Sequence, residues 1–200
     1  MSDLWQKLQD LEWSMYKKSP VGVFSVDGLR GAEITGRVVN EVIPGKTCLD
    51  VGSGALPLPY YMKVANKVEF VGTDPYEGDV EKEYEFRCGT AESLLFMDEE
   101  FDGVLFATSL DHVRSPSMAL DEAYRVLKVA GYLFIWITLR KNDGKYKNWR
   151  RADKPAQYDD YHMWAFTHDD LMSQSREFSL VDVITIGGRE RVYTFKKVIQ

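Results

Sequence analysis

The chain has 200 residues, 44% of them hydrophobic, which suits one α/β domain that buries roughly 70% of its unfolded surface. A net charge of -6 and a pI near 5.2 argue against general affinity for nucleic acid or acidic membranes. No apolar stretch approaches the ~20 residues of a transmembrane helix and the first residues lack the pattern of a signal peptide, so we expect a soluble cytoplasmic protein.

Two amphipathic helices are predicted before the first strand. Leu4, Leu8, Leu11 and Met15 recur at helical spacing and predict a helix over residues 3–17 with one apolar face. This helix either packs on the core or, through its tryptophans, covers the edge of a site. A second helix is predicted over residues 28–42, ending at Pro44-Gly45.

Strands and helices then alternate. The hydrophobic runs predict strands at 47–51, 68–73, 83–88, 102–107 and 132–138, and helices at 57–65 and 116–128. Such alternation predicts a mostly parallel sheet covered by helices on both faces. Ligands of such sheets bind at the carboxyl ends of the strands.

The end of the chain differs from this pattern. Residues 139–160 form a long polar stretch, typical of a lid or an insertion, with seven cations: Arg140, Lys141, Lys145, Lys147, Arg150, Arg151 and Lys154. Thr167 caps a predicted helix at 168–175. Strands at 180–186 and 191–197 around Gly187-Gly188 predict a hairpin, so the last strand should run antiparallel.

A glycine loop is the most informative motif. The strand Thr47–Val51 leads into Gly52-Ser53-Gly54 and then into prolines expected in the first turn of a helix. Glycines allow positive φ and close approach of a ligand, and a helix N-terminus favours a negative group. Asp74, about twenty residues after the loop, suits hydrogen bonds from ribose hydroxyls. The order of these features predicts a nucleotide-cofactor site.

Four segments in this order resemble the class I S-adenosylmethionine-dependent methyltransferases, over roughly residues 28–197. Leu49–Gly54 resembles the family's first motif, and Asp74 is similar to the acid that holds the cofactor ribose. Gly89–Glu92 resembles the segment beside the adenine. Phe101–Val104, Ser109–His112 and Leu120–Gly131 resemble the fourth strand, the loop after it, and the next helix with its turn into strand five.

The resemblance implies a Rossmann-like, doubly wound α/β sheet of seven strands, mostly parallel with an antiparallel last strand, and S-adenosyl-L-methionine as cofactor. It implies nine cofactor-binding residues: Asp50, Gly52, Ser53, Gly54, Asp74, Thr90, Ala91, Glu92 and Ser109. Leu56 stands where the family usually has a third glycine, and Val129-Ala130-Gly131 where proline-glycine is common. From the residues alone, Asp50 or Glu92 could instead cap local backbone, and Asp74 could be a surface turn residue.

Asp111 and His112 follow the fourth strand, at the edge where cofactor and methyl acceptor should meet. A hydroxyl acceptor must lose its proton at or near the transfer step, and an imidazole with a pKa near neutrality suits that task. His112 is therefore our hypothetical general base, with Asp111 as the second catalytic residue; the alternative is a structural histidine. His162 is a weaker candidate for the same pocket, and no metal site is predicted.

The expected domain is single: a helical cap (1–27), a cofactor-binding core (28–138), a lid-like insertion (139–166) and a terminal helix and hairpin (167–200). We expect a small-molecule acceptor, with an anionic group such as a sugar nucleotide if the cations of 139–160 bind it. Nucleic-acid and membrane partners are not expected. Two alternatives stay open: an NAD-dependent oxidoreductase, since Asp74 would also serve an NAD ribose, and a non-catalytic cofactor-binding regulatory subunit.

Overall fold

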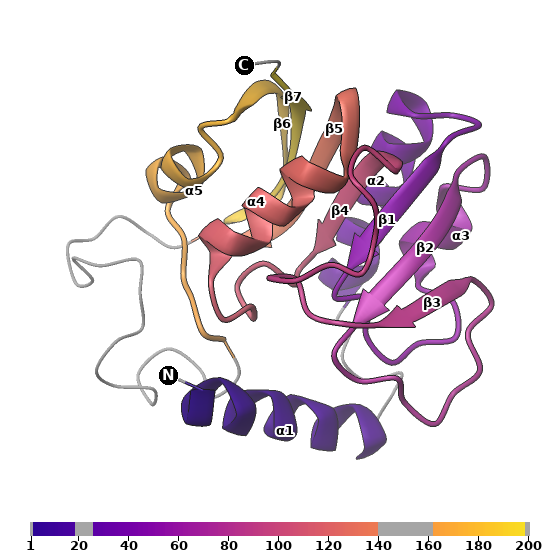
Figure 1. The fold of residues 1–200 in the computed structure, drawn as a ribbon, viewed down its shortest axis with the longest axis vertical. Coiled ribbons are helices and arrows are strands. Elements are labelled where there is room, and N and C mark those ends of the chain that lie inside the picture. Colours follow the sequence, from indigo (N-terminus) through magenta and orange to yellow (C-terminus); the bar gives the residue numbers. More distant parts are fainter. Residues whose placement is uncertain (1, 19–25, 140–161, 199–200) are drawn as a thin grey trace.

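A seven-stranded sheet with helices on both faces forms the protein (Figure 1). The structure, a computed structural model, describes residues 2–18, 26–139 and 162–198. The strands are Thr47–Val51 (β1), Glu69–Asp74 (β2), Glu85–Cys88 (β3), Phe101–Ala107 (β4), Leu127–Thr138 (β5), Phe178–Gly187 (β6) and Glu190–Lys197 (β7). Their order is β3-β2-β1-β4-β5-β7-β6, with β7 antiparallel to β5 and β6. The predicted Rossmann-like sheet with an antiparallel last strand is confirmed.

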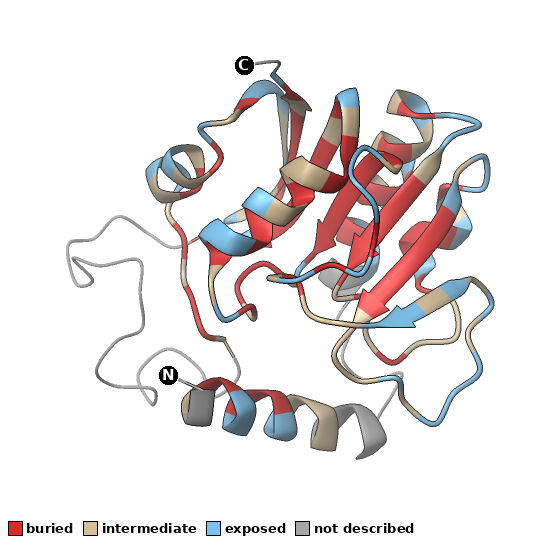
Figure 2. Cartoon of the chain, viewed as in Figure 1, coloured by how far each residue is buried: buried red, intermediate tan, exposed pale blue. Residues whose placement is uncertain are grey.

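Two apolar cores lie on the two faces of the sheet, which is why most residues of its central strands β1 and β4 are buried (Figure 2). Along β4, Val104 and Phe106 belong to the core shared with α4 (Pro116–Val126) and α5 (His168–Gln174). Leu105 and Ala107 belong to the core shared with α2 (Val26–Val42) and α3 (Tyr60–Val64). This alternation is the period-two geometry of a strand covered on both sides.

The first helix, α1 (Ser2–Lys18), lies across the end of the sheet toward which β2 and β4 point (Figure 1). Its buried residues include Trp5, Leu8 and Gln9, whereas Leu11 is 47% exposed. The predicted apolar stripe was therefore wrong at Leu11. The helix packs on the polar loop after β4 as well as on the sheet. Its buried face therefore includes Trp5 and Gln9 and leaves Leu11 exposed.

The helix predicted at 57–65 is shorter, because α3 begins only at Tyr60 with Pro59 at its N-cap. A residue that precedes proline is disfavoured in the α region, so Leu56 and Leu58 delay the start of the helix until the second proline has passed. The helix N-terminus that we expected behind the glycines therefore lies six residues beyond Gly54. A second shift concerns α4, which ends at Val126 and is followed directly by β5. The predicted turn before residue 132 is present as an irregularity within β5, because Leu127 pairs with Phe101 and Tyr132 with Gly103, and Ala130 has a φ of 60°.

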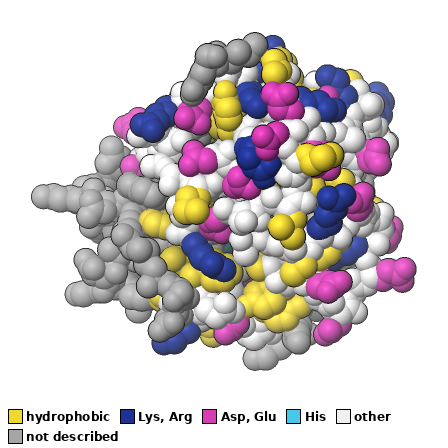
Figure 3. All heavy atoms as spheres, viewed as in Figure 1, with side chains coloured by type: hydrophobic (Ala, Val, Ile, Leu, Met, Phe, Trp, Pro, Cys, Tyr) yellow, Lys and Arg dark blue, Asp and Glu magenta, His cyan; other side chains and the backbone are white. Residues whose placement is uncertain are grey.

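The predicted terminal hairpin is present, but its turn is Gly188-Arg189, because Gly187 is the last residue of β6 and pairs with Glu190. The Thr167 side chain caps α5 in a reciprocal arrangement with Asp170. The stretch 140–160 with its seven cations lies outside the described residues. Over the face shown in Figure 3, acidic and basic side chains of the described residues are interspersed. A search of the described helices for one long and apolar enough to span a membrane found none.

Candidate active site

A cavity of about 330 Å³ opens at the carboxyl ends of the parallel strands, where α1 crosses them. This volume lies within the range of small-molecule sites. Its wall combines α1, the loops after β1 to β4, and one residue from the segment before α5. The lining residues are Trp5, Gln9, Glu12, Trp13, Val51, Gly52, Gly54, Thr73, Asp74, Pro75, Tyr76, Gly89, Thr90, Ala91, Glu92, Ala107, Thr108, Ser109, His112, Val113 and His162.

The glycine loop is fixed between β2 and β4. Gly52 and Gly54 have φ of 82° and 67°, a region that residues with a Cβ rarely adopt. A Cβ on Gly52 would lie 2.4 Å from the Cβ of Ser109. The Ser109 hydroxyl donates to the Val51 carbonyl, and the Gly52 amide donates to the Thr73 carbonyl at 2.8 Å. The loop thus presents its backbone to the cavity, and at Gly52 a side chain would clash with Ser109.

Asp74 joins this loop to the end of β2. Its Oδ2 accepts from the Gly54 amide at 3.0 Å and its Oδ1 from the Tyr76 amide at 3.0 Å. Burial raises the pKa of Asp74 to about 6, although both amides favour its charged form. A carboxylate that is ionised at neutral pH therefore lines the cavity, as a ribose-binding acid requires.

Asp50 and Ser53 are predicted site residues that do not line the cavity. Asp50 is fully buried, and its Oδ2 accepts from the Tyr61 hydroxyl at 2.7 Å, on the α3 side of the sheet. Burial raises the pKa of Asp50 to about 7. Ser53 is also buried, packed against Gly72 of β2. These positions support the loop from behind.

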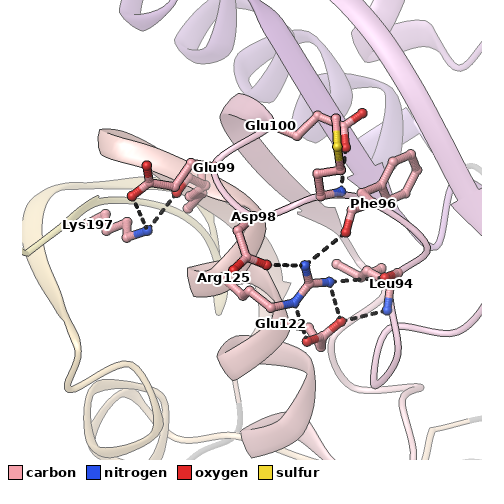
Figure 4. A network of polar contacts seen from close by, with 10 residues as sticks. Leu94, Phe96, Asp98, Glu99, Glu100, Glu122, Arg125 and Lys197 are labelled. Atoms are coloured by element: carbon pink, nitrogen blue, oxygen red, sulfur yellow. Dashed lines mark hydrogen bonds and ion pairs between the residues drawn. The ribbon is translucent and has the colours of Figure 1, made fainter.

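Thr90, Ala91 and Glu92 line the cavity, and the segment that follows them is held by an arginine network (Figure 4). The Glu92 carboxylate accepts from the Arg114 and Ser115 amides at 2.6 and 3.1 Å, so it bridges to the loop after β4 rather than capping its own turn. The Arg125 guanidinium binds both oxygens of Glu122, at 2.7 and 2.8 Å. It also donates to the carbonyls of Leu94 and Phe96 and to Asp98.

Asp111, His112 and His162 meet at one end of the cavity. His112 Nε2 lies 3.8 Å from Asp111 Oδ1, and His162 Nε2 lies 3.6 Å from Asp111 Oδ2. Burial raises the pKa of Asp111, and the two histidines oppose this shift. Of these three residues, Asp111 alone does not line the cavity.

A metal ion is the first ligand to consider for this cluster, whose ligand atoms all lie within 4.8 Å of one another. Neighbouring ligands of one ion with bonds of about 2.1 Å are separated by about 3.0–3.4 Å. The observed separations are wider, so these side chains would have to move to bind a single ion. The arrangement suits a carboxylate placed between two imidazoles better than it suits a preformed metal centre.

The loops of this cavity lie in a region with a recognised similarity. Residues 49–135 match the family model described as a methyltransferase domain. This region is similar to methyltransferase domains, in agreement with the resemblance to the class I S-adenosylmethionine-dependent methyltransferases. The match spans the glycine loop, Asp74, Gly89–Glu92 and Asp111-His112. It decides against the NAD-dependent oxidoreductase, and S-adenosylmethionine is the cofactor of the methyltransferase.

Solved structures share the fold. The 1,6-didemethyltoxoflavin-N1-methyltransferase of Burkholderia thailandensis is 14% identical with a TM-score of 0.72, covering 96% of this chain and 88% of its own. A possible histamine N-methyltransferase of Thermotoga maritima is 23% identical with a TM-score of 0.63, covering 98% and 100%. The [4+2]-cyclase SpnF is 17% identical with a TM-score of 0.65, covering 84% and 81%. Likeness at this identity establishes the fold alone, and curated protein sequences gave no match.

The residues present fit the cofactor of the methyltransferase. The Asp74 carboxylate is available to ribose hydroxyls at the cavity wall, and the positive-φ glycines let the methionine part approach the backbone. When bound, S-adenosylmethionine supplies an activated methyl group on a sulfonium. Ala91 and Val113 add apolar surface to the same wall.

Several lining or supporting residues escaped the sequence analysis. Lys82 donates from Nζ to the carbonyls of Gly54 and Leu56 at 2.6 and 3.1 Å, so a side chain holds the stretch that follows the glycine loop. Gln9 and Glu12 of α1 line the cavity. Their spacing from Trp5, four and seven residues, marks one helix face, but a mixed polar and aromatic face is not a signal of burial.

Proposed function

We propose that the methyltransferase transfers the cofactor's methyl group to a hydroxyl group of a small molecule, with His112 as the general base. The observation that carries this proposal is the position of His112 in the cavity wall, with a buried carboxylate on one side and a second histidine ring at 4.4 Å. A hydroxyl acceptor needs a nearby group that takes its proton. His112 has the right chemistry and lies in the same cavity as the cofactor residues.

The proposed methyl transfer needs no reactant besides S-adenosylmethionine and the hydroxyl acceptor. With S-adenosylmethionine bound, its sulfonium would supply the methyl group to the acceptor oxygen, and the electron pair of the broken carbon–sulfur bond would stay on sulfur, which would become neutral. The hydroxyl proton passes to His112, and the carboxylate of Asp111 stabilises the resulting imidazolium. Holding the reactants in line is the larger contribution, since orientation alone supplies up to ~7–11 kcal/mol of the barrier.

A small acceptor is supported by the enclosed cavity and by the B. thailandensis relative, which was solved with 1,6-didemethyltoxoflavin bound. An anionic group on the acceptor would depend on residues 140–160, because the lining of the described cavity includes no lysine or arginine. Under this proposal the insertion 139–166 acts as a lid and residues 1–27 as a cap on a single catalytic domain. Neutralising Arg150 and Arg151 together would then raise the KM for the acceptor.

The test combines binding with turnover. Methyl-labelled S-adenosylmethionine is incubated with a panel of small alcohols, phenols, sugars and amines, using the wild type and His112→Ala. S-adenosylhomocysteine binding is measured by calorimetry for both. We expect transfer to hydroxyl compounds that falls by about 10²–10⁴-fold in the variant, with unchanged S-adenosylhomocysteine affinity.

Equal rates in the two proteins would remove His112 from the mechanism, and transfer to amines alone would replace the hydroxyl acceptor. Cofactor binding without transfer to any member of the panel would favour a regulatory subunit.

A further inference from the structure

Three residues of α1 converge on His112. Trp5, Gln9 and Glu12 are spaced by four and three positions, so they share one face of the helix. The Trp5 indole donates to the His112 carbonyl at 3.0 Å, and the Gln9 amide donates to the same oxygen at 3.4 Å. Glu12 Oε2 lies 3.1 Å from His112 Nδ1. The helix therefore contacts both the backbone and the ring of the proposed base.

The two nitrogens of the His112 ring face different carboxylates. Glu12 from α1 is at Nδ1, whereas Asp111 is near Nε2 at 3.8 Å, with the His162 ring on the same side of the cluster. Among the described residues near this contact, Arg114 lies with its guanidinium over the Trp5 ring at 3.9 Å. The side chains of His112 and Glu12 are only 14% and 22% exposed, so water screens their interaction weakly.

We propose that Glu12 is a positioning residue for His112, an inference that rests on the proposed role of His112 as the base. The Glu12 carboxylate favours the tautomer with its proton on Nδ1, which leaves Nε2 to receive the acceptor proton. It also stabilises the imidazolium that forms. The sequence places Asp111 beside His112, but the nearer carboxylate comes from a helix one hundred residues earlier in the chain.

Because Glu12 belongs to α1, the basicity of His112 depends on where α1 lies. When α1 is seated on the loop after β4, His112 has its carboxylate partner; when α1 is displaced, His112 loses it. His112 is therefore most basic when α1 covers the cavity.

Nitrogen-15 NMR tests the inference without knowledge of the acceptor. The chain has three histidines, so the ring signals of His112, His162 and His168 can be assigned by substitution. Full-length protein saturated with S-adenosylhomocysteine is titrated as wild type, Glu12→Gln and Glu12→Asp. In the wild type we expect the Nδ1–H tautomer of His112. In Glu12→Gln we expect the pKa of His112 to fall by about 1, with Glu12→Asp between the two.

Asp10→Asn is the matched control, because Asp10 lies on the same helix but contacts Gln6 and Tyr76. His168, whose ring contacts the Tyr193 hydroxyl at 2.9 Å, is the internal reference. The pKa of His112 should not change in Asp10→Asn, and the His168 signals should not change in any variant. The Trp5 indole signal reports whether α1 stays seated. A His112 pKa and tautomer that are identical in Glu12→Gln and the wild type, with that signal intact, would overturn the inference. Failure of the proposed function has a different signature, transfer that persists in His112→Ala.

Discussion

Two buried aspartates next to the glycine loop have different surroundings. Asp74 lines the cavity and accepts from two backbone amides, whereas Asp50 accepts from the Tyr61 hydroxyl, and its Oδ1 has no hydrogen-bond partner among the described residues. Both lose water on folding, which raises both pKa values, that of Asp50 to about 7 and that of Asp74 to about 6. A charge on Asp50 is therefore a cost to the fold near neutral pH.

Asp50→Asn should stabilise the protein increasingly as the pH rises. Folding raises the pKa of Asp50 from an unfolded value near 3.9 to about 7, so the wild type loses stability between about pH 4 and pH 7. The loss is about 1.4 kcal/mol per pH unit, up to about 4 kcal/mol, and it levels off above pH 7. The asparagine avoids it and still accepts from Tyr61.

Urea unfolding from pH 4 to pH 8 measures this difference, with Asp121→Asn on the exposed surface of α4 as the control. A gain in Asp50→Asn that does not vary with pH would contradict the assignment of the titration to Asp50.

At the scale of elements, the sequence predicted the strands and their boundaries best where the hydrophobic periodicity matches the residues that are buried. Strands β1, β2, β4 and β7 were placed within about one residue, because hydrophobic runs and turn glycines determine them locally. The glycine loop and Asp74 could also be predicted, because they lie at the ends of two of those strands, β1 and β2. Parallel topology then brings their ends together.

Prediction failed where the partner of an element is distant or polar. The buried face of α1 is defined by the loop after β4, which no local pattern reveals. The start of α3 depends on two prolines whose effects on the preceding residues outweighed their value in a first turn. The contact of Glu12 with His112 joins residues one hundred positions apart, and the position of Asp50 behind the loop follows from the strand's register. None of these is encoded in a local motif.

The arginine network of α4 should stabilise the segment after Glu92. Arg125 is bonded to Glu122, Asp98 and two carbonyls. Arg125→Met removes the donor to those carbonyls and leaves the Glu122 carboxylate with only the Leu94 amide among its described donors, so we expect a loss of about 2–4 kcal/mol. Because the segment adjoins Thr90–Glu92, weaker S-adenosylhomocysteine binding should accompany it.

Arg37→Met is the matched control, because Arg37 is 69% exposed and pairs only with Glu33, one turn away on α2, among the partners described. Such surface pairs are worth less than about 1 kcal/mol. Chemical denaturation of both variants gives the comparison, and equal losses would show that the Arg125 network stabilises the fold no more than an exposed ion pair does.

At the scale of the whole molecule, cofactor binding should stabilise the domain. S-adenosylhomocysteine at 100 times its Kd adds about 2.7 kcal/mol, or roughly 5–10 °C in Tm for a chain of this size. Asp74→Ala should reduce that shift, because it removes the carboxylate at the cavity wall. NAD should give no shift.

Thermal unfolding of both proteins with each ligand measures these effects. A shift with NAD alone would contradict the assignment of the cofactor. An undiminished shift in Asp74→Ala would mean that the ribose is held elsewhere.

The placement of α1 has a consequence for synthesis of the chain. The Trp5 indole donates to the carbonyl of a residue 107 positions later. At about 5–20 residues per second, α1 leaves the ribosome roughly 5–20 s before its docking partner has been translated. During that interval its apolar side, with Trp5 and Leu8, has no docking surface and is open to chaperones. Helix α1 is thus made well before the loop on which it docks, and the active site is complete only after both have been translated.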